Sequence, residues 1–201
     1  MKYQEILKNG LSELGLKIES IKLEQYLELL HKWNHAYNLT AIRDLESMVS
    51  KHILDSLAIL PFVNGESLLD VGTGAGLPGI PLAIAAPNLK IVLLDSNGKK
   101  IRFLQEVKRQ LKLDNVEIIQ TRVESYHPDT LFDILTSRAF SSIEQMLNLT
   151  RHLITPDGMW VLMKGLRPDD ELAAIQMPSR VESYIVPGVD GERCCVIIEN
   201  N

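Results

Sequence analysis

From Ser67 onward, short apolar runs alternate with segments whose apolar residues recur at helical spacing. The runs that predict strands are 67–71, 91–95, 116–120, 132–137 and 159–164. The helical patterns between them are 80–86, 99–111 and 142–153. Strands and helices in this alternation are typical of a parallel sheet whose strands are joined by crossover helices. We therefore expect an α/β fold.

The two ends of the chain depart from this alternation. Residues 3–60 carry apolar residues at helical spacing only, which predicts an all-helical opening. The last apolar runs, 180–188 and 192–200, predict two strands that form an antiparallel hairpin at the sheet edge. A chain of 201 residues favours one main core with a small extension. We expect a helical extension, 1–60, packed on a main domain, 61–201.

Composition excludes several classes of protein. The chain is 45% hydrophobic and 23% charged, as ordinary globular proteins are. It has no apolar stretch of membrane-spanning length, and its N-terminus lacks the apolar segment of a secretory signal, so we expect a cytoplasmic protein. A formal net charge of -5 argues against non-specific coating of nucleic acid, although it leaves room for a local basic patch.

The two cysteines, Cys194 and Cys195, are adjacent. A disulfide between neighbours strains the backbone, and the sequence has no Cys/His spacing typical of a metal site. We therefore expect reduced structural thiols and no bound metal.

The stretch DVGTGAGLPG, residues 70–79, places four glycines directly after the first predicted strand. This is the position of the first strand-to-helix turn of a doubly wound sheet, where ligands bind. Pro78 suits the first position of the helix that follows. Glycines let the backbone approach a nucleotide-like ligand closely. A turn without a ligand is the alternative, but such a turn needs only one glycine.

Three positions bear on the identity of the ligand. A dinucleotide fingerprint counted from Gly72 requires glycine where the chain has Leu77, which weakens NAD without excluding it. Asp70 would repel a pyrophosphate but suits S-adenosylmethionine, which carries an ammonium and a sulfonium. Asp95, after the next strand, is placed to accept both ribose hydroxyls of an adenosine, or alternatively to cap a helix. The loop thus favours S-adenosylmethionine.

Several segments carry a more specific resemblance: DVGTGAGLPGIPLAI, LLDSNGKKIRFL, TRVESY, SRAFSSI and LMKG, with HKWNHAYNLTAIRD and HILDSL nearer the N-terminus. In this order, over nearly the whole chain, they resemble the ribosomal RNA small subunit methyltransferase G family, also called glucose-inhibited division protein B. The resemblance implies a class I, Rossmann-like methyltransferase with a mostly parallel seven-stranded sheet. It also implies transfer of a methyl group from S-adenosylmethionine to N7 of one guanine in the decoding-region loop of bacterial 16S ribosomal RNA.

The resemblance further implies cofactor contacts at matching positions in the glycine loop and after the third and fourth strands. These are Gly72, Leu77, Val123, Glu124 and Arg138, and the loop residue Gly74 and the ribose acceptor Asp95 complete the expected set.

Arg138 is expected to contribute most to activity, because it follows the strand where cofactor and target base should meet. Guanine N7 has a lone pair and no proton, so attack on the sulfonium methyl needs no general base or covalent intermediate. Positioning alone supplies roughly 7 to 11 kcal/mol. A bidentate contact from the Arg138 guanidinium to guanine O6 and N7 would block the nitrogen that is methylated. Arg138 should therefore hold the cofactor carboxylate, a phosphate or guanine O6 alone. A surface ion pair is the alternative.

Basic residues supply candidate RNA contacts. One run surrounds the predicted helix 99–111: Lys99, Lys100, Arg102, Lys108, Arg109 and Lys112. A solvated helix face explains several of these equally well, because Glu106 and Asp114 dilute the run. A second group lies near strand ends or loops: Arg122, Lys164, Arg167 and Arg193. We expect Arg122 and Lys164, together with Lys100 and Arg193, to contact RNA.

Two groups in the helical opening have competing interpretations. Trp33 and Tyr37, four residues apart, form either a packed aromatic pair or a wall beside the cofactor or a base. His52, Asp55 and Ser56 superficially suggest a hydrolase triad, but the sequence has no GxSxG elbow. We expect Asp55 to pair with the lysine four residues before it, Lys51.

Other functions remain open for this fold, because fold alone does not determine function. A small-molecule methyltransferase and an NAD-dependent oxidoreductase are the enzymatic alternatives, and binding of S-adenosylhomocysteine or NAD distinguishes them. A non-catalytic RNA-binding or assembly module would bind ribosomal RNA without turnover. Whether the substrate is naked RNA, the small subunit or an assembly intermediate is also open.

Overall fold

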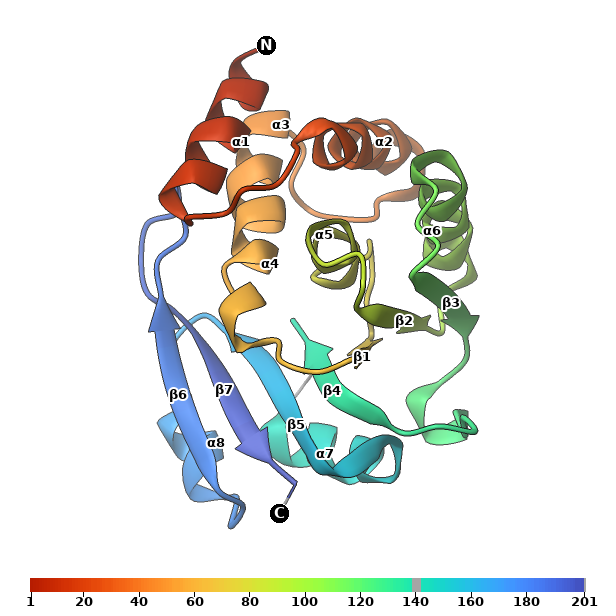
Figure 1. The fold of residues 1–201 in the computed structure, drawn as a ribbon, viewed down its shortest axis with the longest axis vertical. Helices are drawn as coiled ribbons and strands as arrows, with labels where there is room; N and C mark the ends of the chain where they lie inside the picture. The colour runs from red at the N-terminus through yellow and green to blue at the C-terminus, as the bar shows by residue number, and fades with distance from the viewer. Residues whose placement is uncertain (139–141, 201) are drawn as a thin grey trace.

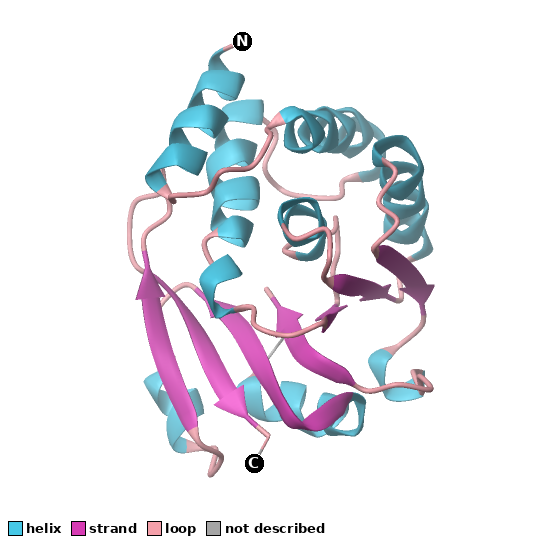
Figure 2. Ribbon diagram, in the orientation of Figure 1, coloured by secondary structure: helices cyan, strands magenta, loops and turns pink. Residues whose placement is uncertain are grey.

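The computed structural model describes residues 1–138 and 142–200. A seven-stranded sheet has the order β3-β2-β1-β4-β5-β7-β6, with helices on both faces (Figures 1 and 2). The strands are β1 (Ser67–Val71), β2 (Lys90–Asp95), β3 (Val116–Gln120), β4 (Phe132–Ser137), β5 (Ile154–Lys164), β6 (Ser179–Tyr184) and β7 (Arg193–Glu199). Strands β1 to β5 pair in parallel, whereas β7 pairs antiparallel with β5 and β6. The predicted α/β sheet with a C-terminal hairpin is confirmed.

The chain before β1 contains helices only, which confirms the helical opening. The α-helices are α1 (Lys2–Glu13), α2 (Ile21–Tyr37), α3 (Leu45–Met48), α4 (Asp55–Leu57), α5 (Gly79–Ala85), α6 (Gly98–Leu111), α7 (Ile143–Thr150) and α8 (Asp169–Ala173). A π-helical stretch η1 (Val49–Leu54) joins α3 to α4, and short 3-10 turns are η2 (Leu60–Phe62), η3 (Val123–Ser125) and η4 (Arg151–Leu153). In the described residues, no helix has both the length and the apolarity needed to cross a membrane.

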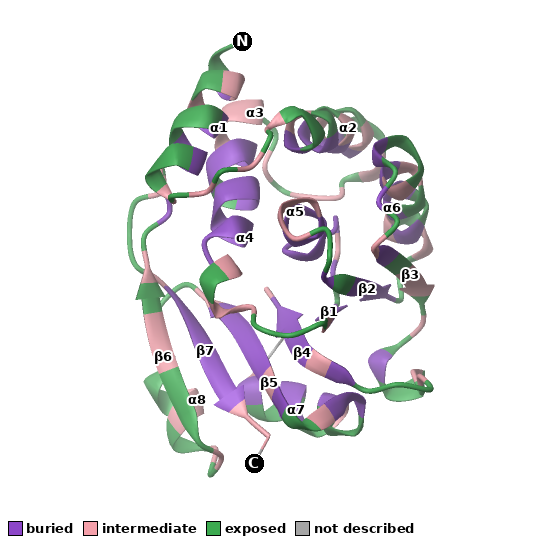
Figure 3. Cartoon of the chain, viewed as in Figure 1, coloured by how far each residue is buried: buried purple, intermediate pink, exposed green. Residues whose placement is uncertain are grey.

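Two apolar cores lie on the two faces of the sheet. Successive strand residues point to opposite faces, so Leu68 joins one core and Leu69 the other. The first core is covered by α1 to α6 and the second by α7 and α8 (Figure 1). Figure 3 shows that β4, β5 and β7 are mostly buried between these layers, whereas the edge strand β6 is largely exposed.

The helical opening shares its core with the sheet. Leu23 and Tyr26 of α2 are fully buried in the same cluster as Phe103 of α6 and Leu68 of β1. The division into 1–60 and 61–201 remains a prediction, and this shared core supports an extension packed on the main domain.

Some boundaries differ from the predictions. Pro78 precedes the first residue of α5 rather than occupying it. Strand β5 begins at Ile154 instead of residue 159, because Ile154 pairs with Phe132 across an irregularity in the ladder. The short helix α8 was not expected, since its polar sequence has no buried residue.

Candidate active site

The loop after β1 is shaped by glycine conformations and by one buried carboxylate. Gly72, Gly74 and Gly76 have φ angles of 66°, 63° and 93°, which side chains disfavour. Asp70 is fully buried, and its Oδ2 accepts hydrogen bonds from Thr73 Oγ1 at 2.6 Å and from the backbone nitrogen of Gly79 at 2.9 Å. Burial raises the pKa of Asp70 to about 6. Asp70 therefore ties the loop together from inside, which corrects the expectation that it faces a cationic ligand.

Gly79, the first residue of α5, belongs to the site but is absent from the predicted cofactor set. A Cβ atom there would collide with Leu93 Cδ2 and lie 2.8 Å from Asp70 Oδ2. The glycine thus lets α5 approach β2 closely, the role of the third glycine in a nucleotide-binding turn. The signal was present in the sequence, because GxGxxG counted from Gly74 ends at Gly79.

The N-terminal helices brace this loop. Tyr26 of α2 is fully buried and donates a hydrogen bond to the carbonyl oxygen of Ala75 at 2.7 Å. Trp33 stacks on Tyr37 with 5.1 Å between ring centroids and lies 5.7 Å from the ring of Phe103 on α6. This contact with α6 confirms the packed aromatic pair, and no sequence signal pointed to Tyr26.

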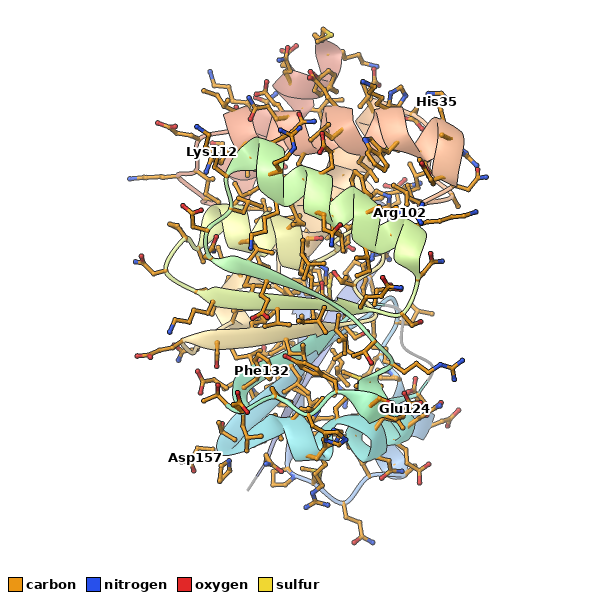
Figure 4. The ribbon with its side chains drawn as sticks, turned by 90° about the vertical axis from the view of Figure 1, so that its right-hand side faces the viewer. His35, Arg102, Lys112, Glu124, Phe132 and Asp157 are labelled. Atoms are coloured by element: carbon orange, nitrogen blue, oxygen red, sulfur yellow. The ribbon has the colours of Figure 1, made fainter. Side chains whose placement is uncertain are left out.

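A cleft of about 290 Å³ opens where β1, β2 and β3 end. Its lining includes four predicted cofactor residues and one predicted RNA contact: Gly72, Asp95, Val123, Glu124 and Arg122. Gln145 and Leu149 of α7 close its far side. Figure 4 shows Glu124 and Arg102 at this side of the molecule, with Lys112 and Asp157 at the opposite side. The carboxyl ends of neighbouring parallel strands therefore bring residues together that are distant in sequence.

Asp95 is the most connected polar group of this cleft. Its Oδ2 accepts hydrogen bonds from the backbone nitrogen of Gly74 at 2.9 Å and from Lys100 Nζ at 3.2 Å, and its Oδ1 accepts one from the backbone nitrogen of Asn97 at 2.8 Å. A carboxylate has about four acceptor positions, so one remains for a ribose hydroxyl and a second requires Lys100 to move. Asn97, not Asp95, caps α6. Lys100, predicted as an RNA contact, thus forms an ion pair with Asp95, a predicted cofactor contact.

Leu77 and Arg138 do not line the cleft. The side chain of Leu77 is buried in the first core, so only its backbone is available to a ligand. Arg138 follows β4, and its Nη1 donates to the carbonyl oxygen of Lys51 at 3.1 Å and lies 3.2 Å from His52 Nδ1. Residues 139–141 of the SRAFSSI segment lie outside the described residues.

The expected pairing of Asp55 with Lys51 is wrong. Asp55 lies between Arg138 Nη1 at 3.9 Å and Arg193 Nε at 3.7 Å, and in the described residues it forms no ion pair with Lys51. The Ser56 hydroxyl donates to the carbonyl oxygen of His52 at 2.6 Å, so it is not aligned with the histidine ring as a nucleophile. In the apparent triad, Ser56 hydrogen-bonds within its helix and Asp55 faces the two arginines, so these residues do not form a hydrolase triad.

His52 is held as a neutral imidazole. Its Nε2 lies 2.8 Å from Thr40 Oγ1, while Nδ1 faces Arg138. Burial, followed by the nearby Arg138 charge, lowers the pKa of His52 to about 4. A protonated ring would face the guanidinium with a like charge.

The neutral state of His52 predicts a pH dependence of folding. The folded pKa of about 4 lies below the ordinary value of 6.5, so the unfolded chain binds more protons between these values and stability falls as pH falls from 6.5. We expect His52→Gln to flatten this part of the profile by up to about 1.4 kcal/mol per pH unit. Urea unfolding across the window measures the slope. The matched substitution His35→Gln, at an exposed site, should keep the wild-type slope, and equal slopes for both variants would contradict the assignment.

The predicted RNA contacts differ in how they are paired. Lys164 Nζ lies 2.9 Å from both carboxylate oxygens of Glu171, and Arg193 faces Asp55. Arg122 is exposed at the cleft, and its side chain forms no ion pair within residues 1–138 and 142–200. Of the basic run on α6, only the first turn lies near the cleft, since Lys112 is at the far end of that helix (Figure 4).

Both cysteines are free and buried in β7, as expected for structural thiols. Burial raises the pKa of Cys194, and it raises the pKa of Cys195 to about 12. Thiols in this state are poor nucleophiles at neutral pH. In the part of the chain that is described, no cluster of three or more His, Cys, Asp or Glu residues is arranged to hold a metal.

The double substitution Cys194→Ser/Cys195→Ser should therefore leave the methyl transfer that the family resemblance implies within about twofold of the wild-type rate, because neither thiol is activated as a nucleophile. The measurement is turnover of the folded variant, with folding checked by circular dichroism. Loss of turnover in a folded double variant would implicate a covalent step.

Comparisons with known proteins agree with this architecture. The family model described as rRNA small subunit methyltransferase G (GidB) matches residues 19–192. The ribosomal RNA small subunit methyltransferase G of Legionella pneumophila (strain Philadelphia 1) is 61% identical over 199 residues, which cover 99% of this chain and 96% of the relative. The protein of that name from Pseudomonas aeruginosa (strain PAO1) is 50% identical over 199 residues, covering 96% and 93%.

Solved structures show the same fold at low sequence identity. A SAM-dependent methyltransferase from Aquifex aeolicus has a TM-score of 0.58 at 18% identity, covering 77% of this chain and 93% of that one. TYW2 of M. jannaschii, solved in complex with AdoMet, has a TM-score of 0.56 at 16% identity, covering 73% and 74%. The fold is therefore that of S-adenosylmethionine-dependent methyltransferases, and with the match over residues 19–192 the chain belongs to the rRNA small subunit methyltransferase G family.

Proposed function

We propose that this protein transfers a methyl group from S-adenosylmethionine to N7 of one guanine in the decoding-region loop of bacterial 16S ribosomal RNA. The observation that carries the proposal is the cleft at the ends of β1 to β3, where Gly72, Asp95, Val123 and Glu124 meet in a chain of this family. The names of its relatives support small-subunit ribosomal RNA as the substrate, the family resemblance implies guanine N7, and the cleft supports the cofactor.

The residues of the cleft suit the adenosine part of a cofactor. Asp95 keeps one acceptor position for a ribose hydroxyl. The backbone at Val123 and Glu124 borders the same space, next to Leu94 and Leu149, which offer apolar surface to a base. A ribose acceptor at this position serves NAD and S-adenosylmethionine alike, and the family match and the methyltransferase fold favour S-adenosylmethionine.

When bound, S-adenosylmethionine supplies a methyl group on a positively charged sulfur. The chain has to align this group with the lone pair of guanine N7 and to exclude water, and it needs no base because N7 carries no proton. We assign alignment to the glycine loop, held by Asp70 and Tyr26, and to Arg138. We propose that four basic residues meet the RNA backbone: Arg122 at the cleft, Lys100 beside Asp95, Lys164 at the end of β5 and Arg193 at the start of β7.

The test is transfer of a labelled methyl group from S-adenosylmethionine into 16S RNA from unmethylated small subunits, offered free, assembled and as an assembly intermediate. N7 modification is located by alkaline-induced strand cleavage. We expect label at a single guanine, and the preferred form of the RNA identifies the substrate. A protein that binds the cofactor but labels none of these forms would contradict the proposed substrate and point to a small-molecule acceptor.

A further inference from the structure

Arg138 and Arg193 share one buried carboxylate. Asp55, at the start of α4, has a side chain only 11% exposed, and it lies 3.9 Å from Arg138 Nη1 through Oδ2 and 3.7 Å from Arg193 Nε through Oδ1. The two arginines come from different strand ends, one after β4 and one at the start of β7. One anion therefore faces two cations, and the group of three retains a positive charge.

Within residues 1–138 and 142–200, both arginines keep hydrogen-bond donors free. The two distances to Asp55 exceed 3.5 Å, so the carboxylate attracts the guanidinium groups without using their N–H groups. Within the described residues, Arg138 uses only Nη1, toward Lys51 and His52, and Arg193 donates only from Nη1, toward the carbonyl oxygen of Glu192. A guanidinium has five N–H donors, and both side chains are about 30% exposed, at 28% and 30%.

The arginine pair lies away from the cofactor cleft. The cleft opens over β1, β2 and β3, whereas the pair extends from the end of β4 to the start of β7, two strands further along the sheet. Arg193 is paired in register with Tyr184, the last residue of β6, so it stands at the same sheet edge as Arg138. A ligand that contacts both arginines therefore lies at the same edge of the sheet as the cofactor cleft, but over β4 to β7.

We propose that Asp55 is a positioning residue that holds Arg138 and Arg193 as a two-arginine site for one phosphodiester group of the RNA beside the methylated guanine. This inference rests on the proposed function. Two guanidinium forks with free donors match the oxygens of a phosphate, and excess positive charge favours an anion over the neutral edge of a base. The N-terminal helices thus contribute to RNA binding through a carboxylate that does not itself touch the RNA.

The test measures the dissociation constant of the 16S RNA fragment over a series of KCl concentrations, with S-adenosylhomocysteine bound. Asp55→Asn keeps the shape of the side chain and removes its charge. We expect binding about tenfold weaker at about 0.1 M salt, and a salt slope smaller by about 0.7, the value for one phosphate of a single strand. Arg193→Ala, which leaves Asp55 and the helices intact, should give the same two changes. The control Glu182→Gln also removes the acidic partner of an arginine, Arg180, and should bind as the wild type does.

A double-variant cycle separates positioning from a purely structural role. If Asp55 acts through the two arginines, adding Asp55→Asn to the combined variant Arg138→Ala/Arg193→Ala should weaken RNA binding by less than about twofold more. If the losses of RNA affinity multiply and the salt slope stays unchanged, the proposal is overturned. Weaker binding of S-adenosylhomocysteine with an unchanged salt slope for RNA would also overturn it, because the arginine pair would then bind the cofactor carboxylate. If Asp55→Asn does not fold, an unchanged slope for Arg193→Ala alone overturns it. Wild-type protein that methylates no RNA would instead refute the proposed function.

Discussion

Replacing Arg138 with alanine is expected to lower methyl transfer by at least about 100-fold while the chain remains folded. The guanidinium is held by the Lys51 carbonyl and faces His52 and Asp55, which fixes its position between η1, α4 and the end of β4. If catalysis depends on alignment, misplacement by about 1 Å costs about 100-fold, and loss of a positioned charge costs a similar factor. Single-turnover transfer to 16S RNA at saturating cofactor measures the effect.

Arg180→Ala is the matched control for this variant. Arg180 is also an ion-paired arginine, with Glu182 and Glu199 as partners, but it stands near the other end of β6, away from Tyr184. Its loss should leave the rate of transfer at the wild-type level. An Arg138→Ala protein with unchanged cofactor affinity and unchanged turnover would remove Arg138 from the active site.

Substituting Gly79 with alanine should lower the free energy of unfolding by about 3 kcal/mol. The added methyl group collides with Leu93 and crowds the Asp70 oxygen that accepts the Gly79 N–H, so the substitution both overpacks the core and weakens a buried hydrogen bond. In a helix, alanine is ordinarily more stabilising than glycine by about 1 kcal/mol. A decrease in the free energy of unfolding would therefore indicate the collision. Urea unfolding measures the change.

Gly165→Ala tests the same substitution where there is space. Apart from Gly165 and its two chain neighbours, no atom of the described residues lies within 4 Å of a Cβ built there, so the free energy of unfolding should change by no more than about 0.5 kcal/mol. A Gly79→Ala protein that is as stable as the wild type would show that α5 can shift away from β2 without cost.

The sheet was predictable because its strands are buried on both faces. Segments 67–71 and 132–137 each place neighbouring apolar residues in the two cores, Leu68 and Leu69 in the first segment and Ile134 and Leu135 in the second, and their observed bounds agree with the predicted ones. Where burial is partial, prediction was weaker. The start of β5 contains Thr155, Pro156 and Asp157, which are polar or break strands, and only pairing across the sheet identifies it as a strand. Helix α8 has no buried residue and therefore no apolar pattern to reveal it.

The cofactor residues were predictable for a topological reason. Carboxyl ends of adjacent parallel strands meet at one edge, so glycines after β1 and acids after β2 and β3 had to converge once the strands were known. The partner of Asp55 was not predictable in this way. Spacing along one helix suggests only Lys51, whereas Arg138 and Arg193 approach through tertiary packing of distant strands. Tyr26 was missed likewise, because a buried tyrosine in an apolar stripe resembles any core residue.

The hydrogen bond from Tyr26 to Ala75 has a thermodynamic corollary. If α2 stabilises the glycine loop in its ligand-accepting shape, occupancy of the loop must stabilise α2 by the same coupling free energy, since linkage is reciprocal. Amide protons in α2, remote from the cleft, should then exchange more slowly with solvent when S-adenosylhomocysteine is bound. Helix α2 would thereby become more stable when a ligand binds in a cleft that this helix does not line.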